Sequence, residues 1–83
     1  SADIFFWRDN HGTEIDLLFE HGGLLHAVEI KSGATFSPDW LRGLDRWRHY
    51  AGADAATPVL VHGGRDSFLA GGAHVLGWRQ LGM

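Results

Sequence analysis

One stretch near the start of the chain constrains the fold more than any other: two strand-like segments joined by Gly22-Gly23. Residues 13–20 alternate between apolar and mostly charged side chains, which is typical of a strand with one core face and one polar face. Residues 24–31 form a second such segment. Because glycine adopts the positive φ angles of tight turns at little steric cost, the sequence predicts a β-hairpin. The predicted core face of the first strand consists of Ile15, Leu17 and Phe19.

The register of this hairpin follows from the position of its turn. With the loop centred on Gly22-Gly23, paired residue numbers sum to 45, whether the loop contains two residues or four. The predicted pairs are Asp16 with Glu29, Glu14 with Lys31, and Leu17 with Val28.

Two carboxylates that face each other across an antiparallel pair repel. A divalent cation would offset this repulsion, and Mg²⁺ and Mn²⁺ prefer oxygen ligands, so Asp16 and Glu29 are candidate metal ligands. Lys31 lies two residues after Glu29, on the same face of the strand. Metal and ammonium together suit the hydrolysis of a phosphodiester. The alternative is a solvated hairpin face on which Lys31 forms an ordinary ion pair with Glu14.

The bulk composition restricts the class of protein. The chain has 83 residues, enough for one domain spanning residues 1–83, and it contains no cysteine, which excludes disulfides and thiolate metal sites. No apolar run approaches the roughly 20 residues of a membrane span, and no P-loop motif is present. These features predict a cytoplasmic protein without membrane contact. The formal net charge of −3 requires a local cluster of arginines for any contact with nucleic acid.

The rest of the chain completes an α/β pattern. Ser37-Pro38 predicts the start of a helix that ends near Tyr50 or Ala51, with Gly52 as its C-cap. Residues 57–62 predict a strand buried on both faces, and residues 73–81 contain a predicted edge strand. The predicted order is β-β-β-α-β-β, in a mixed, mostly antiparallel sheet of four or five strands with one main helix.

Several motifs together resemble a known family. They are Phe5-Phe6-Trp7-Arg8, a turn ending in Gly12, Glu14-Ile15-Asp16, the Gly22-Gly23 turn, Val28-Glu29-Ile30-Lys31-Ser32-Gly33, the Gly43-Leu44 helix and the Val75-Leu76-Gly77-Trp78 strand. Over almost its whole length the chain resembles the C-terminal domain of unknown function of prokaryotic AAA-type ATPases. That domain is similar to the PD-(D/E)XK, or restriction-endonuclease-like, nuclease superfamily.

The resemblance implies roles for particular residues. Asp16 and Glu29 match the superfamily's two metal-binding acids, Lys31 matches its catalytic lysine, and Ile30 would offer its backbone carbonyl to the metal. Glu14 is a candidate accessory acid. The implied cofactor is Mg²⁺ or Mn²⁺, and the implied activity is metal-dependent cleavage of DNA phosphodiesters, either retained or lost in a degenerate relative.

The resemblance also has a gap. The first helix of the superfamily core is missing, because this chain begins at the first strand. We therefore expect two copies to associate as a homodimer that buries the exposed surface. We also expect the chain to be a fragment of a longer protein whose ATPase domain lies outside these residues.

Two other functions compete with the nuclease. One is a non-catalytic interaction or dimerisation module of an AAA-type ATPase, in which the charged hairpin only presents a surface. The other is binding of single-stranded DNA or RNA through aromatic and arginine side chains, which predicts an affinity that falls steeply with salt.

Overall fold

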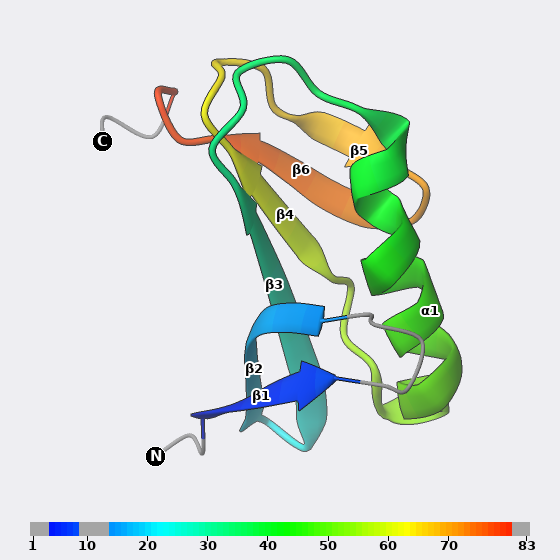
Figure 1. The fold of residues 1–83 in the computed structure, drawn as a ribbon. Helices are drawn as coiled ribbons and strands as arrows, with labels where there is room; N and C mark the ends of the chain where they lie inside the picture. The colour runs from blue at the N-terminus through cyan, green and yellow to red at the C-terminus, as the bar shows by residue number, and fades with distance from the viewer. Residues whose placement is uncertain (1–3, 9–13, 81–83) are drawn as a thin grey trace.

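A computed structural model describes the backbone of residues 4–8 and 14–80, and the side chains of residues 15–80. Within these described residues, six strands and one α-helix form an α/β domain (Figure 1). The strands before the helix are β1 (Ile4–Arg8), β2 (Glu14–His21) and β3 (Leu24–Lys31). The helix α1 (Arg42–Ala51) lies between two 3-10 turns, η1 (Pro38–Leu41) and η2 (Gly52–Asp54). The strands after it are β4 (Val59–His62), β5 (Phe68–Ala70) and β6 (Ala73–Gly77).

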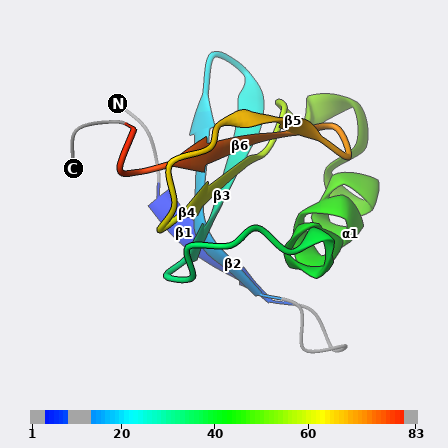
Figure 2. The same cartoon turned by 90° about the horizontal axis from the view of Figure 1, so that it is seen from above.

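The strands form a single mixed sheet in the order β1-β2-β3-β4-β6-β5. Three of its neighbouring pairs are antiparallel, and the two central pairs, β3 with β4 and β4 with β6, are parallel. The chain therefore needs a crossover between β3 and β4, which α1 provides by packing across one face of the sheet (Figure 2). The predicted mixed, mostly antiparallel sheet with one main helix is confirmed, but in the described residues it has six strands where four or five were predicted, because β5 was not foreseen.

The β2–β3 hairpin has the predicted register but a different core face. Its ladder runs from His21 opposite Leu24 to Leu17 opposite Val28. The pairing of β2 with β1 shifts between Phe5 and Trp7, where three steps along β2 match two steps along β1. Such a bulge breaks the alternation of side chains. The predicted core face of Ile15, Leu17 and Phe19 is therefore wrong beyond its first residue, because among the described side chains of β2 the buried ones are Ile15 and Leu18.

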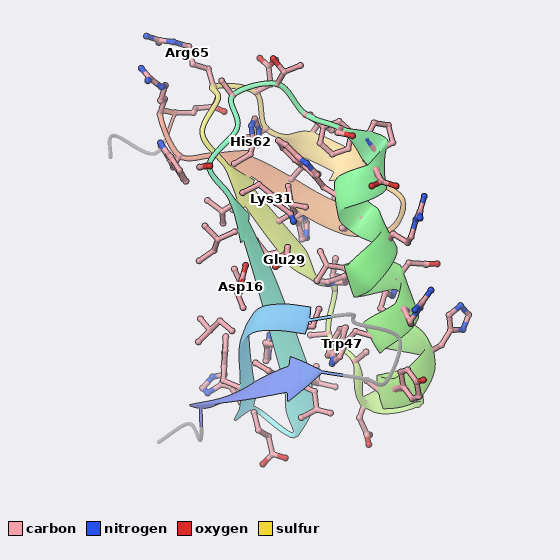
Figure 3. All side chains as sticks on the ribbon, in the orientation of Figure 1. Asp16, Glu29, Lys31, Trp47, His62 and Arg65 are labelled. Carbon is pink, nitrogen blue, oxygen red and sulfur yellow. The ribbon has the colours of Figure 1, made fainter. Side chains whose placement is uncertain are left out.

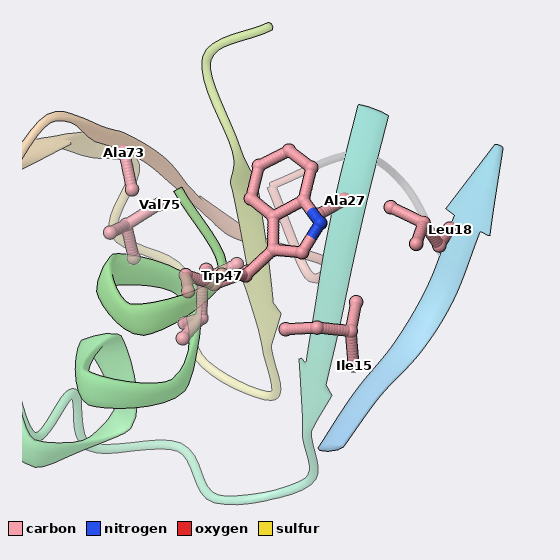
Figure 4. Packing of buried hydrophobic residues seen from close by; sticks show 8 residues of the cluster. Ile15, Leu18, Ala27, Trp47, Ala73 and Val75 are labelled. Carbon is pink, nitrogen blue, oxygen red and sulfur yellow. The ribbon is translucent and has the colours of Figure 1, made fainter. Parts of the chain in front are cut away.

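Helix α1 anchors the core from the other side. Leu44 and Trp47 are each 1% exposed, and the indole of Trp47 extends from the helix toward Ala27, Ile15 and Leu18 of the sheet (Figure 4). Ser37 takes the predicted N-cap position, but without a side-chain hydrogen bond and before a 3-10 turn. Gly52 ends the helix at φ 60°, as predicted. Within the described residues, no helix is long and apolar enough to cross a membrane.

The last third of the chain differs from the prediction. The strand predicted at the edge of the sheet, β6, lies between β4 and β5, and the short strand β5 occupies the edge. Gly71 and Gly72, both at positive φ, join β5 to β6 in a two-residue turn. The same signal that predicts the first hairpin is thus present here, but β5 contains only three residues and shows no alternation. In β4, Val59 and Val61 are half-buried, so this strand is not buried on both faces.

Candidate metal centre

Asp16 reaches β3 through its side chain. It lies just beyond the end of the β2–β3 ladder, so the predicted backbone pairs of Asp16 with Glu29 and of Glu14 with Lys31 are not part of that ladder. Instead the Oδ2 atom of Asp16 accepts a hydrogen bond of 2.8 Å from the backbone N–H of Ile30. Bulges commonly re-aim a side chain in this way. The carboxylate thus replaces the backbone as the partner of β3.

Glu29 meets Asp16 from the other strand. Its side chain is only 7% exposed, and its neighbour across the β3–β4 ladder is Leu60, which is fully buried. This burial, together with a hydrogen bond to Asp16 and the negative charge of Asp16, raises the pKa of Glu29 to about 8. At neutral pH Glu29 is therefore mostly protonated and donates its proton toward Asp16. Figure 3 shows the two side chains beside β3, at neighbouring positions along the strand.

The pKa of Asp16 moves in the opposite direction. The hydrogen bond from Glu29 lowers it below its usual value of 3.8, and the N–H of Ile30 and the charge of Lys31 add to this effect against a smaller cost of burial. One carboxylate and one carboxylic acid therefore share a single proton. Such an unequal pair is typical of sites that hold a cation or transfer a proton.

Lys31 lies on the same face of β3 as Glu29, two residues further along the strand. Its charge favours the ionised forms of both acids. The predicted ion pair between Lys31 and Glu14 falls on a side chain outside the described residues, so that alternative stays a prediction. The structure does bring Asp16, Glu29 and Lys31 into one electrostatic unit.

The backbone carbonyl of Ile30 has a suitable direction for the role that the resemblance implies. In an extended strand, the N–H and C=O of one residue leave the same side of the strand. Because the N–H of Ile30 points to Asp16, its carbonyl faces the same edge.

The donors fit a hard divalent cation better than any other metal. Two carboxylates and a carbonyl are all oxygen ligands, and Mg²⁺ commonly takes only one or two protein carboxylates and keeps several waters. No cluster of three or more acidic or histidine side chains able to hold a metal occurs in the described part of the chain.

Sequence reasoning missed the buried histidine beside Lys31. His62 ends β4, lies opposite Lys31 in the parallel ladder and is 1% exposed. Its Nδ1 accepts the N–H of Gly64 at 3.1 Å, so its Nε2 is the protonated nitrogen that donates to the carbonyl of Asp66 at 2.9 Å. The signal in the sequence was a polar residue at the end of an apolar strand, followed by two glycines.

The fold and the site together define a small α/β domain with a paired-carboxylate centre on a mixed sheet. Residues 1–81 match the model of the family described as "Domain of unknown function (DUF4143)", and the chain belongs to that family. The family is known as a C-terminal domain of proteins that contain an AAA-type ATPase.

Other comparisons add little to this assignment. A UPF0102 protein of Wolinella succinogenes is 60% identical over 25 residues, which are 30% of this chain and 23% of that protein. The chain thus matches less than a quarter of that relative's length. No solved structure matches the chain.

Proposed function

We propose that this domain is a nuclease-like module of the PD-(D/E)XK type, which binds Mg²⁺ or Mn²⁺ and acts on DNA phosphodiesters. The observation that carries the proposal is the coupling of the Asp16 and Glu29 carboxyl groups, which moves their pKa values in opposite directions, at a place where Ile30 of β3 holds Asp16 and Lys31 lies on the same face as Glu29. A divalent ion can take the place of the proton that lies between Glu29 and Asp16. The proton neutralises only one of the two carboxylates, whereas the ion neutralises both.

Each residue has a separate part in this proposal. Asp16 and Glu29 would hold the ion together with the carbonyl of Ile30, and Glu14 stays a candidate accessory acid. When bound, a divalent ion polarises the phosphate and lowers the pKa of a coordinated water. The ammonium of Lys31 stabilises the negative charge that develops on the phosphate. The hydrogen bond from Ile30 to Asp16 orients that carboxylate before any ligand arrives.

The first prediction concerns metal affinity. We expect isothermal titration with Mn²⁺ at neutral pH to show a saturable site that Asp16→Asn weakens at least about 10-fold, the loss seen when even an outer partner of a metal ligand is removed. The ion must also displace the proton of Glu29, so the heat should vary with the ionisation enthalpy of the buffer.

A matched control separates this site from general surface charge. Asp39→Asn makes the same chemical change at an acid that is 67% exposed and pairs with Arg42, and it should leave the affinity unchanged. Equal weakening by both substitutions, or the absence of metal-dependent heat in the wild type, would contradict the proposal.

A second candidate function is a dimerisation module, and one observation favours it. The sheet face opposite α1 carries no helix in the described chain (Figure 2), and its described side chains include no Asp, Glu, Lys or Arg. Ile30 on this face is 51% exposed. Uncharged, largely apolar faces of this kind suit a self-complementary contact between two copies. The face is made up of Leu17, Phe19, His21, Leu24, His26, Val28, Ile30, Val59, Val61, Leu69, His74 and Leu76.

The second prediction tests this face. We expect sedimentation equilibrium to show a dimer of the 9.2 kDa chain, and Ile30→Lys to shift it toward the monomer because a charge would be buried without a partner. Tyr50→Lys on α1, at a side chain that is 60% exposed, is the control and should not change the mass. A monomeric wild type at micromolar concentration would remove this candidate and leave the metal site untouched.

A further inference from the structure

The carboxyl ends of the three parallel strands meet at one edge of the sheet. Lys31 ends β3, His62 ends β4 and Gly77 ends β6, and each of these residues lies next to its neighbour in the ladder. In open α/β sheets, ligands bind beyond this edge. The segments that follow the three strands, residues 32–34, 63–67 and 78–80, together form a surface that we call the carboxyl-edge platform.

Backbone hydrogen bonds tie the platform together. Gly63 donates its N–H to the carbonyl of Gly33 at 2.9 Å, and Trp78 donates to the carbonyl of His62 at 2.9 Å. The ring of His62 holds the loop after β4 at two points, through Gly64 and Asp66. The position of this loop is therefore fixed relative to Lys31.

Close backbone contacts make the platform compact. A Cβ atom on Gly63 would collide with the carbonyl oxygen of Ser32, and one on Gly64 would collide with that of Ala34. A Cβ atom on Gly77 would lie 2.6 Å from the carbonyl carbon of Arg65. Only glycine permits such close backbone contacts, so these glycines allow the loop that carries Arg65 to pack tightly against its neighbours.

The carboxyl-edge platform contains two arginines. Arg65 and Arg79 are both exposed. Arg79 donates its Nε to the carbonyl of Gly63 at 3.1 Å, which fixes its guanidinium group to the loop. Arg65 makes no hydrogen bond or ion pair with any other described residue. Asp66 is the only acidic residue on the platform, so with Lys31 the edge carries three cations against one anion.

The arginines of the helix are differently engaged. Arg42 pairs with Asp39, and Arg48 donates to the carbonyl of Gly72 at 3.3 Å. The positive charge that lies near Lys31 is therefore carried by the platform. Arg65 follows His62 by three residues, so its Cα lies within about 11 Å of that of His62. Figure 3 shows Arg65, His62, Lys31 and Glu29 in succession along the sheet.

We propose that the carboxyl-edge platform binds the phosphodiester backbone of a nucleic acid strand, with Arg65 and Arg79 contacting phosphates next to the one that reaches Lys31. This inference rests on the proposed nuclease-like function and adds the residues that hold the strand. Because these contacts go to phosphate, they position the strand without reading its sequence. A guanidinium group suits this role because its donors match two phosphate oxygens at once.

The third prediction tests the platform by binding alone. In EDTA, where no cleavage can occur, we expect a short fluorescein-labelled DNA duplex to bind with an affinity that falls as salt rises. Arg65→Gln should weaken binding several-fold at low salt and reduce the slope of log affinity against log salt by about 0.9, the value for one lost phosphate contact. Two duplexes of different sequence should be affected equally.

The control makes the same change in charge elsewhere. Arg42→Gln removes one positive charge from an exposed side chain of the helix, and it should leave both the affinity and the slope nearly unchanged. Equal losses in the two variants, or no binding by the wild type, would overturn the platform. Because metal binding is measured separately by calorimetry, loss of the platform proposal would leave the carboxylate site standing, and the reverse also holds.

Discussion

Replacing Trp47 with alanine is expected to lower the stability of the domain by about 3–5 kcal/mol, the largest loss expected for a single substitution in this chain. The side chain is 1% exposed and joins α1 to both strands of the hairpin. Removing a buried tryptophan costs about 3–5 kcal/mol. A domain of 83 residues has a total stability of roughly 4–12 kcal/mol at the usual value per residue, and small domains lie toward the low end. For a domain at this low end, one substitution therefore removes most of the free energy of unfolding.

Urea denaturation followed by circular dichroism measures this loss. His49→Ala is the matched control, because it removes an aromatic ring from an exposed side chain of the same helix, and surface changes usually cost about 0.5 kcal/mol or less. If Trp47→Ala and His49→Ala shifted the midpoint equally, the core described above would not be the one that holds the sheet and the helix together.

The sequence predicted local structure well because the determinants of that structure are local. Gly22-Gly23 determines the hairpin and its register, and Gly52 ends the helix. That register places Asp16 close to Glu29, although the ladder ends one pair earlier and the Asp16 side chain makes the contact with β3. The bulge near Asp16 could not be predicted, since it depends on how β1 pairs with β2 and leaves no mark in the alternation of β2 itself.

Long-range pairing accounts for the rest of the differences. His62 lies beside Lys31 only because β3 and β4 are parallel, and the two residues are joined through a helix and its connections. No periodicity in the sequence reports such a contact. The burial of Glu29 has the same origin, because Leu60 comes from β4. The acids were therefore predictable, but their unequal pKa values were not.

Replacing Glu29 with glutamine is expected to stabilise the metal-free protein at alkaline pH. The folded state holds a proton on Glu29 up to a pKa of about 8, whereas the unfolded chain releases it near 4.5. Between these values the folded state binds more protons, so the free energy of unfolding falls as pH rises, by at most about 1.4 kcal/mol per pH unit. The stability that protonated Glu29 contributes is fully present below the unfolded-state pKa of 4.5, and it is lost as pH rises through the folded-state pKa of about 8.

Asp16 does not reverse this trend within that window. Its pKa is lowered from 3.8, so its contribution is present above 3.8 and is lost only as pH falls further. Glutamine at position 29 keeps an N–H donor for Asp16 and cannot ionise. The free energy of unfolding of the variant should therefore stay nearly constant across the window. At pH 8 it should exceed that of the wild type by up to about 4 kcal/mol.

Urea denaturation in EDTA at roughly pH 5 and pH 8 measures the effect, and Glu20→Gln, at an exposed acid of the same hairpin, is the control that should retain the wild-type slope. A wild type whose stability does not fall across this range would show that the two acids do not share a proton.

Saturating Mn²⁺ at pH 8 adds a second comparison. It should raise the free energy of unfolding of the wild type, whose second carboxylate can then ionise against the ion, and should raise that of Glu29→Gln little, because this variant lacks that ligand. An equal increase in both proteins would place metal binding elsewhere on the chain.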